Sequence, residues 1–583
     1  MTIAPTAAVT GQSRPRFEER VDPQTGERYC AVFVRGAALK DDPILNKGTC
    51  FTQAERRALG LRGMLPPAVS TPDEQAQRAY ENYLNAGDDV GRYLFLAALQ
   101  DRNETLFHRL LFDHLEEMVP IVYTPTVGQV CERYSHIYRR PRGVYVSSQD
   151  RGCIADLLVN ADRAQTEVIV VTDNEAILGI GDQGVGGMGI AIGKLALYTA
   201  GAGIPPAHGL PITLDVGTDN AALLQDPLYL GARHARLRGD EYFSLLDELV
   251  EAIADVYPGA IVQWEDFASQ RAFDVLGRHR RRLPSFDDDI QGTGAVVEAG
   301  VRTALARIGR RLADERVLFF GAGASGAGCA LQMRRALAAD GASERQLSRR
   351  VLCLDSRGLI LEDRPGLAGY KTGIAADPGI VSGWTPGQDG TFRLLDVVTQ
   401  FRPTILVGVS GQPGSFSQEV VRAMHAGCDR PIILALSNPT RKVEATPADI
   451  LRWTNGAAVV GTGSPFPPVR LNGVIHRIGQ CNNALVFPGI GLGARIAGAR
   501  WLPDEVFAAA ARAVHAWSGA GAQPGASIYP PISRLRGVSR GVAVAVAQAI
   551  VDTGEVPPLT TREIEDRVTA AMWQPVYRPY RAA

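Results

Sequence analysis

Apolar positions follow one rhythm in the first part of the chain and another after residue 144. Over 52–140 apolar residues return every three to four positions, a period that predicts amphipathic helices. Beyond residue 144 short continuous apolar runs begin, first at Val168–Val171 and then at Ala260–Trp264. Such runs favour strands that are buried on both faces. The change predicts a helical region followed by an α/β region.

The clearest alternation of strand-like and helix-like segments lies between residues 316 and 461. Continuous apolar strands separated by helices are typical of a parallel sheet covered on both faces, and the doubly wound, Rossmann-like fold builds such a sheet. After Gly493 the chain returns to alanine-rich helix. The predicted strands are Val317–Phe320, Val351–Leu354, Ile405–Val407, Ile432–Leu436 and Ala457–Val460.

These patterns divide the chain into five segments of an α/β protein. We expect a peripheral arm without clear periodicity, a helical N-terminal region, an α/β domain completed by C-terminal segments, a Rossmann-like doubly wound domain, and a final segment with a loop followed by helices. Their bounds are 1–44, 45–143, 144–285, 286–465 and 466–583.

Charge and cysteine content narrow the class of protein. The 583 residues include 62 acidic and 61 basic side chains, so the net charge of −1 gives no electrostatic footprint for nucleic acid or an anionic membrane. The eight cysteines are scattered without C-x-x-C pairs, and charges or glycines interrupt the long apolar runs. We therefore expect a cytoplasmic protein with no nucleic acid and no membrane among its partners.

Glycine is over-represented, with 62 copies, and forms the pattern G-x-G-x-x-G twice. Gly321, Gly323 and Gly326 follow a predicted strand and open a helix, a setting in which backbone N–H groups meet a dinucleotide pyrophosphate. Asp355 ends the next predicted strand, where an acid binds a ribose. The alternative is tight packing of helix on sheet without a ligand. For the copy within Gly179–Gly184, packing explains the pattern at least as well.

One lysine, Lys194, lies on the apolar face of a predicted helix, with Ile190 four residues before it and Leu197 three residues after it. Burial on that face would lower the pKa of the ammonium toward the range of a general base. A lysine at the edge of the core, with its ammonium in solvent, gives the same sequence pattern.

Five carboxylates stand at the end of a predicted strand and the start of a helical stretch, where open α/β sheets bind ligands. They are Glu265, Asp266 and the three within Asp287–Asp289. Three converging carboxylates would suit a hard divalent cation such as Mg²⁺ or Mn²⁺. A helix cap and acids favoured by the helix dipole explain the same residues without a metal.

Three further polar side chains, Tyr123, Asn438 and Asn483, stand beside predicted turns or glycine-rich stretches. A tyrosine in such a place is commonly a core aromatic with a tethered hydroxyl. Each asparagine could contact a ligand or only shape its turn. Their types alone leave both interpretations open.

Taken in order, the motifs around these residues resemble those of malic enzymes, which oxidatively decarboxylate L-malate to pyruvate and CO₂ with NAD or NADP and a divalent metal. The resemblance runs from about Leu45 to about Trp573, nearly the whole chain. The motifs are LNKGTCFTQAERRALGLRGMLPP, EEMVPIVYTPTVG, VTDNEAILGIGDQGVGGMGIAIGKLALYTA, LDVGTDN, DPLYLG, WEDF, FDDDIQGTGAV, FFGAGASGAG, LSNPT, GTGSPF and CNNALVFPGIGLG.

The resemblance implies a role for each candidate residue. Lys194 would be the general base and Tyr123 the general acid, and the 144–285 domain would bind malate and metal. The implied sites are a catalytic set (Tyr123, Lys194 and Asp288), metal ligands (Glu265, Asp266 and Asp289), substrate contacts (Asn438 and Asn483) and cofactor contacts (Gly321, Gly323, Gly326, Asp355, Ser356, Arg357, Asn438 and Asp289).

One departure from the family concerns substrate binding. In VTDNEAILGIGDQG the malic-enzyme pattern has arginine where this chain has Ala176, and glycine where it has Asn174. In the family that arginine bridges the substrate carboxylate and the cofactor, so either another residue serves here or the affinity for malate is lower. Malolactic enzymes, which release lactate, also lack it, although they depart from the YTPTVG pattern that is intact around Tyr123. Malolactic chemistry is therefore the main alternative; a non-catalytic binding relative and a metal-free amino-acid dehydrogenase are the others.

The residues after the second strand of the Rossmann-like region bear on the choice of cofactor. Asp355 would bond the ribose 2′-hydroxyl of NAD and disfavour the 2′-phosphate of NADP. Ser356 and Arg357 resemble NADP-using members, and Lys371 would add to that charge. We expect NAD, with NADP as the alternative, and by resemblance a homodimer or homotetramer.

Overall fold

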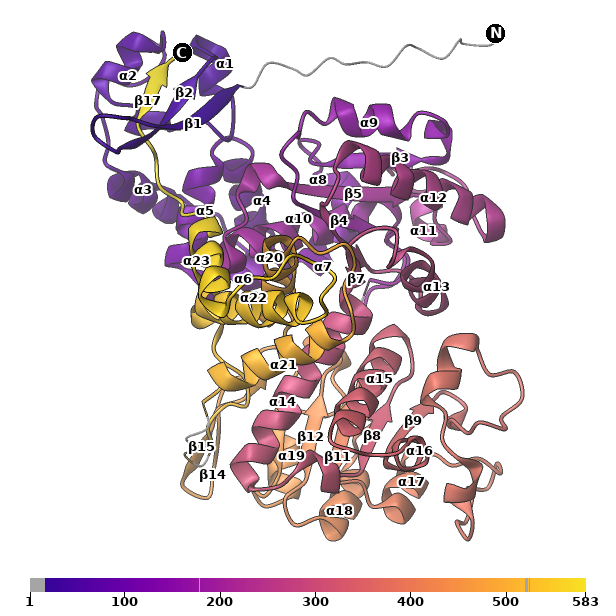
Figure 1. Cartoon of the computed structure of the whole chain (residues 1–583). Helices are drawn as coiled ribbons and strands as arrows, with labels where there is room; N and C mark the ends of the chain where they lie inside the picture. Colours follow the sequence, from indigo (N-terminus) through magenta and orange to yellow (C-terminus); the bar gives the residue numbers. More distant parts are fainter. Residues whose placement is uncertain (1–15, 178, 520–522, 524) are drawn as a thin grey trace. The chain divides into compact units, whose positions relative to one another are not determined.

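The computed structural model describes residues 16–177, 179–519, 523 and 525–583, and the chain in it divides into two compact units (Figure 1). One unit holds the chain up to His114, Val159–Asp162 and Gln574–Ala583, and the other holds Leu115–Leu158 and Arg163–Trp573. The helical region that we expected to reach residue 143 is thus split, because the helices that follow His114 pack with the α/β region.

A small three-stranded sheet lies in the first unit. β1 (Phe17–Val21) pairs antiparallel with β2 (Arg28–Val32), and β17 (Tyr580–Ala582) pairs parallel with β2. Residues 16–44 therefore form a hairpin and a helix rather than the peripheral arm that we expected, while residues 1–15 of that arm lie outside the described residues. The local pattern missed the sheet because its third strand comes from the other end of the chain.

Helices complete this unit, as the apolar period over 52–140 predicts. Helix α2 (Gln53–Ala58) begins at a capping box. In it the side chain of Thr52 accepts from the backbone N–H of Glu55, and the Glu55 carboxylate accepts from the backbone N–H of Thr52. The helices are α1 (Gly36–Lys40), α2 (Gln53–Ala58), α3 (Pro72–Leu84), α4 (Asp89–Gln100) and α5 (Glu104–Asp113).

The second unit contains a five-stranded parallel sheet in the order β3-β5-β4-β6-β7. β6 and β7 are neighbours, so the residues that follow them lie at the same edge. The strands are β3 (Val144–Ser147), β4 (Val168–Thr172), β5 (Gly209–Asp215), β6 (Ile261–Glu265) and β7 (Ser285–Asp287). The helices along this stretch of chain are α6 (Leu115–Val122), α7 (Thr126–Glu132), α8 (Tyr134–Ile137), α9 (Ile154–Asn160), α10 (Met188–Leu197), α11 (Ala221–Gln225), α12 (Gly239–Val256) and α13 (Ser269–His279).

One helical segment of the described residues, Gly184–Ala202, is long and apolar enough to cross a membrane by length and composition alone. It includes α10, and 89% of its most apolar window is buried inside the fold. α10 packs against β4, β5 and α7. The segment is therefore accounted for as a core helix of the five-stranded sheet.

A seven-stranded sheet forms the region that we expected to be Rossmann-like, in the order β10-β9-β8-β11-β12-β13-β16. Its pairs are parallel except that of β10 with β9, and every predicted strand of the region is confirmed. The strand order reverses between β8 and β11, the place where open α/β sheets bind ligands. The strands are β8 (Val317–Phe320), β9 (Val351–Asp355), β10 (Gly358–Leu359), β11 (Ile405–Gly408), β12 (Ile432–Ala435), β13 (Val459–Thr462) and β16 (Gly479–Gln480).

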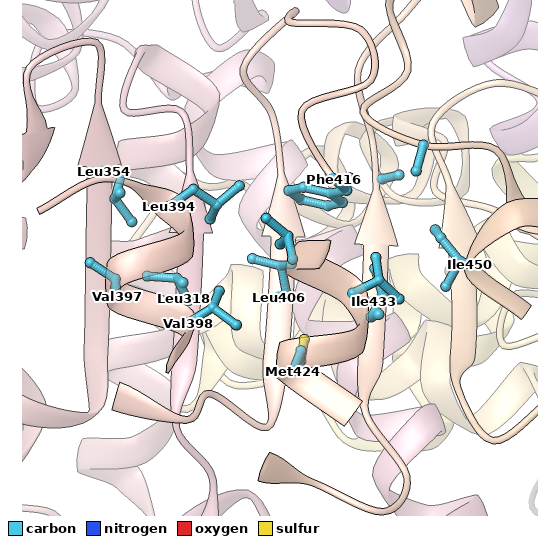
Figure 2. Close-up of a cluster of buried hydrophobic side chains, with 14 of the residues drawn as sticks. Leu318, Leu354, Leu394, Val397, Val398, Leu406, Phe416, Met424, Ile433 and Ile450 are labelled. Atoms are coloured by element: carbon cyan, nitrogen blue, oxygen red, sulfur yellow. The ribbon is translucent and has the colours of Figure 1, made fainter. Parts of the chain in front are cut away.

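Helices cover this sheet, and Figure 2 shows the apolar side chains packed on one of its faces. Leu318 and Leu406 of the sheet lie in one buried cluster with Val398 and Met424, which come from helices α17 and α18. The helices of this region are α14 (Thr293–Ile308), α15 (Ala324–Ala339), α16 (Glu344–Arg350), α17 (Leu394–Phe401), α18 (Gln418–Gly427) and α19 (Pro447–Trp453).

The last part of the second unit is a hairpin followed by helices, as the alanine-rich pattern predicts. α20 packs closely on α22 because a Cβ at Gly493 would lie 2.5 Å from the carbonyl oxygen of Ala543. The elements are β14 (Val469–Leu471), β15 (Val474–His476), α20 (Phe487–Ala497), α21 (Glu505–Trp517), α22 (Leu535–Val551) and α23 (Thr561–Ala571).

Candidate active site

Lys194 lies in a buried cluster of charged side chains at the edge of the five-stranded sheet. Its residue is 1% exposed, and its Nζ lies 2.8 Å from Glu265 Oε1 and forms a closer ion pair with Asp288. Glu265 ends β6 and Asp288 follows β7, so two neighbouring parallel strands bring both carboxylates to one lysine. Lys194 is therefore a core residue with two ionic partners, and the alternative of a solvent-reaching lysine is wrong.

The protonation of Lys194 differs from what the helical pattern suggests. Burial alone would lower the pKa of the ammonium, as we expected. The negative charges of Asp288 and Glu265 outweigh burial, however, and raise the pKa of Lys194 well above its usual value. In this arrangement the side chain is an ammonium, so a base can form only when its proton moves to a neighbour.

Three carboxylates beside this lysine converge on one point. Glu265, Asp266 and Asp289 are buried, and one oxygen from each lies within 4.8 Å of the others. Burial raises the pKa of Glu265 to about 8 against the opposing charge of Lys194. Burial and the neighbouring carboxylates likewise raise the pKa of Asp266. Buried acids in such a group are stabilised by a cation.

The conformation of Asp266 fits a bound cation. Its φ is 61°, in the left-handed region that non-glycine residues seldom adopt, and its backbone N–H donates to Asp289 Oδ2 at 2.9 Å. Its own Oδ2 is buried and has no hydrogen-bond partner among the described residues. A buried carboxylate oxygen without a donor, next to two others, suits an oxygen-seeking cation such as Mg²⁺ or Mn²⁺.

A second layer of polar side chains holds Glu265, and sequence reasoning missed it. Gln263 donates from Nε2 to Glu265 Oε2 at 2.9 Å, and Tyr198 donates to Gln263 Oε1 at 2.6 Å. The signal was available, since Gln263 is a polar residue in an apolar strand, two positions before Glu265 and so on the same face.

Tyr123 follows α6 and faces the lysine. Lys194 Nζ lies 5.5 Å from the centre of the Tyr123 ring and 4.6 Å from that of Phe487. Burial raises the pKa of Tyr123 far above its usual value and outweighs the opposing charge of Lys194. The hydroxyl therefore stays protonated and is available as a proton donor.

The two candidate asparagines approach from the segments after the strands of the seven-stranded sheet. Asn483 donates from Nδ2 to Asp288 Oδ2 at 3.0 Å and to Thr293 Oγ1 at 2.9 Å. Asn438 follows β12, and its Oδ1 accepts from Ser464 Oγ at 2.5 Å. Asn483 therefore shares a carboxylate oxygen with Lys194, whereas the Asn438 amide is held by a residue that follows β13.

One cavity of about 510 Å³ unites these groups. Its size suits a small substrate together with part of a cofactor. The candidate residues that line it are Tyr123, Lys194, Glu265, Asp266, Asp289, Asn438 and Asn483, and the polar residues that sequence reasoning missed include Arg441, Ser464 and Gln480.

The glycine turn at Gly321 is not part of the lining, but it lies where the strand order reverses. It follows β8 directly and opens α15, as predicted. Gly321 has a φ of 109°, and a Cβ there would lie 2.5 Å from the carbonyl oxygen of Val409, which follows β11. Val409 and Ser325 of α15 do line the cavity, so the cavity extends to this turn. Gly323 precedes α15 as its N-cap, and a Cβ at Gly326 would lie 2.0 Å from the carbonyl oxygen of Gly321.

Asp355 ends β9, and cations surround it. Its Oδ2 lies 2.5 Å from Arg364 and 2.7 Å from Lys371. Burial opposes ionisation, but the hydrogen bonds from Arg364 and Lys371 lower the pKa of Asp355 to about 2. The backbone N–H of Arg357, after Ser356, donates to Asp355 Oδ1 at 2.9 Å. The structure thus brings the candidate ribose contacts together around an ionised acid, outside the cavity lining.

Comparison with known proteins decides the family. Residues 100–280 match the model of "Malic enzyme, N-terminal domain", and residues 290–551 match that of "Malic enzyme, NAD binding domain". The chain is 47% identical over 546 residues to the NAD-dependent malic enzyme of Sodalis glossinidius, covering 94% of this chain and 96% of that protein. It belongs to the malic enzyme family.

Other malic enzymes agree in sequence and in fold. The NAD-dependent malic enzyme of Acinetobacter baylyi is 45% identical, with 94% of this chain and 96% of that protein covered. The crystal structure of Entamoeba histolytica malic enzyme has a TM-score of 0.55 at 22% identity and covers 88% of this chain and 90% of that one. The malic enzyme of Pyrococcus horikoshii has a TM-score of 0.52 at 22% identity, with 78% and 89% covered.

The two departures from the malic-enzyme pattern lie beside the carboxylate cluster. Asn174 has a φ of 60°, and its Nδ2 donates to Thr213 Oγ1 at 2.5 Å. Asparagine tolerates this left-handed backbone, which explains how it replaces a glycine. Ala176 donates its backbone N–H to the carbonyl oxygen of Asp266 at 2.9 Å. Its methyl group brings no charge to this place in the malic enzyme.

Proposed function

We propose that this malic enzyme converts L-malate to pyruvate and CO₂, with NAD as hydride acceptor and Mg²⁺ or Mn²⁺ as metal. The observation that carries the proposal is that Lys194, Tyr123 and three converging carboxylates line one cavity. The relatives named NAD-dependent malic enzymes, matched over 94% of the chain, support NAD over NADP.

Lys194 takes the proton of the C2 hydroxyl when malate is oxidised, and NAD, when bound, would supply the hydride acceptor for C2. Because Lys194 is an ammonium in its ion pairs, its own proton first passes to Asp288, which contacts Nζ directly and is not one of the proposed metal ligands. Among the described residues that line the cavity, it is the only amine.

The carboxylates Glu265, Asp266 and Asp289 would hold the metal, which when bound acts as a Lewis acid on the C2 oxygen of the substrate. Gln263 fixes the orientation of Glu265 through its 2.9 Å hydrogen bond. Asn483 fixes Asp288 in the same way at 3.0 Å.

Tyr123 protonates C3 after CO₂ has left, which gives pyruvate. Burial keeps its hydroxyl in the protonated form that this step requires. The centre of the Tyr123 ring lies 5.5 Å from Lys194 Nζ, and this short distance supports a proton donor and a proton acceptor that act on one small substrate.

Malolactic decarboxylation is the second candidate, and Ala176 favours it. A single assay separates the two. The purified protein is incubated with L-malate and Mn²⁺, and absorbance at the reduced-nicotinamide band is compared with NAD and with NADP, while the product is identified. We expect NADH and pyruvate, loss of activity with EDTA and recovery with Mn²⁺. Lactate without net NADH would replace the proposal by malolactic chemistry, and no turnover of malate would refute both.

We further propose a homodimer or homotetramer that works in the cytoplasm. The family resemblance supports the first, and the eight unpaired cysteines support a reducing setting. Sedimentation of the purified protein at several concentrations tests the assembly, and a monomer throughout would contradict it.

A further inference from the structure

The charges in the cavity pose a problem for malate, which brings two carboxylates. Four lining residues are acidic, and they are Glu132, Glu265, Asp266 and Asp289. A divalent cation would offset only part of that charge. Where the malic-enzyme pattern has an arginine that bridges the substrate carboxylate and the cofactor, this chain has Ala176. A substrate dianion needs a further positive group to bind in such surroundings.

Only two lining residues in the described part of the chain are cationic, and they differ in how they are engaged. Lys194 is buried, and two carboxylates hold it. Arg441 has a side chain that is 67% exposed, and its ion pair with Glu132 is long at 4.0 Å, with the Glu132 side chain 44% exposed. Exposed ion pairs of that kind contribute little free energy, so the Arg441 guanidinium is the cation in the lining that is available to bind a ligand.

The position of Arg441 relates it to the loop that carries Ala176. In that loop Gly179 has a φ of 82°, and a Cβ there would lie 2.4 Å from the carbonyl oxygen of Asn438. The loop therefore rests directly on the segment that follows β12. Arg441 lies three residues beyond Asn438, in the 3₁₀ turn Thr440–Lys442, and lines the same cavity.

We propose that Arg441 supplies the guanidinium that pairs with a carboxylate of malate, in place of the arginine that this chain lacks at Ala176. A guanidinium matches a carboxylate with two parallel N–H donors, and Arg441 lines the same cavity as Lys194 and Tyr123. The inference rests on the proposed function, since it takes malate as the substrate.

The test compares Arg441→Ala with Lys442→Ala, which removes a cation from the same turn but outside the cavity lining. A charged hydrogen bond of this kind predicts a rise of about 10- to 100-fold in KM for malate in Arg441→Ala. KM for NAD stays near the parent value, and Lys442→Ala resembles the parent in both. Calorimetric titration of each protein with L-malate and Mg²⁺ measures the same loss without turnover.

A double variant makes the test specific to the missing arginine. Adding Ala176→Arg to Arg441→Ala restores malate affinity at least in part, because the guanidinium then comes from the adjoining loop. Equal malate KM values for Arg441→Ala and Lys442→Ala, or a rise confined to the KM for NAD, would overturn the assignment. A parent protein that neither binds nor oxidises malate would refute the proposed function itself, and that result is separate from any difference between variants.

Discussion

The stretches Gly179–Gly193 and Gly321–Gly328 share the pattern G-x-G-x-x-G, and each follows a strand and continues into a helix, α10 in the first and α15 in the second. Gly321 follows the last residue of β8 directly, whereas a loop beginning at Asp173 separates β4 from Gly179. In the second stretch the turn lies at the reversal of strand order. In the first, Gly179 lines the cavity that holds the candidate catalytic residues, and the glycines from Gly184 to Gly193 approach other protein atoms closely.

Two glycines of the first stretch allow close contact between the segment that leads to Lys194 and the helices beside Tyr123. A Cβ at Gly186 would lie 2.7 Å from the carbonyl oxygen of Cys131, and one at Gly193 would lie 2.7 Å from that of Val122. α10 can therefore approach α6 and α7 closely enough for Lys194 to face Tyr123. The second stretch thus forms the proposed dinucleotide turn, whereas glycines that follow the pattern in the first stretch set the spacing between the two proposed proton-transfer groups.

The largest effect should come from Lys194, the residue that directly follows the first stretch. We expect Lys194→Ala to lower malate oxidation by about 10⁴-fold or more, because it removes the proton acceptor and leaves Asp288 and Glu265 without their cation. Lys194→Arg keeps the charge but cannot give up its proton, so it should be similarly inactive. NADH formation with saturating malate and Mn²⁺ measures the loss. Activity within tenfold of the parent in either variant would remove Lys194 from the reaction.

The next effect concerns the tyrosine that α10 faces. Tyr123→Phe should reduce pyruvate formation by about 10²- to 10³-fold, since a positioned general acid contributes on that scale. Hydride transfer in a single turnover should change less than pyruvate formation. If both steps keep the parent rate, Tyr123 is only a packing residue, and α10 then brings Lys194 close to a side chain without a role in proton transfer.

A smaller effect is expected when the close approach of α10 to α6 is disturbed. Gly193→Ala forces α10 away from Val122 and should lower kcat by about 10- to 100-fold, as a displacement near 1 Å does at other sites. KM for NAD should stay close to the parent value. Gly277→Ala is the matched control, because a Cβ at this helical glycine meets nothing within 4 Å. Unchanged kcat in Gly193→Ala would show that the spacing is not critical.

The smallest effect is expected at the dinucleotide turn. Gly321→Ala combines a φ of 109° with a contact to Val409, a strain of about 1–3 kcal/mol, and should raise KM for NAD by roughly tenfold. Gly341→Ala, with a φ of 92° and open space around its Cβ, controls for backbone strain alone. If Gly321→Ala lowers kcat and leaves KM for NAD unchanged, the second stretch does not act through cofactor binding, and the difference between the two stretches is refuted.

Much of the fold could be predicted because its information is local. Continuous apolar runs located five strands of the seven-stranded sheet, all but the two-residue strands β10 and β16, and the predicted Val317–Phe320 has the bounds of β8. The three-stranded sheet of the first unit could not be predicted in this way. Its β17 pairs with β2 from the far end of the chain, and no local period reports such a pairing.

The site shows the same difference between features with a local sequence signal and features that depend on contacts between distant residues. Residue type and position at strand ends pointed to Glu265 and Asp266, and the structure brings both to one cluster with Lys194. The direction of the Lys194 pKa shift was wrong, because the ion pair with Asp288 spans 94 residues and is invisible in a helical pattern. Arg441 carried no motif of its own, so only the cavity identified it.

The pairing of β2 with β17 also means that β2 is synthesised long before its partner strand. β2 ends at Val32, and its partner begins at Tyr580. At ribosomal rates of about 5–20 residues per second, roughly half a minute to two minutes pass before β17 emerges. During that interval one edge of β2 is open to other strands, a known route to aggregation. Nascent chains stalled before residue 580 should therefore need protection by chaperones that completed chains no longer require.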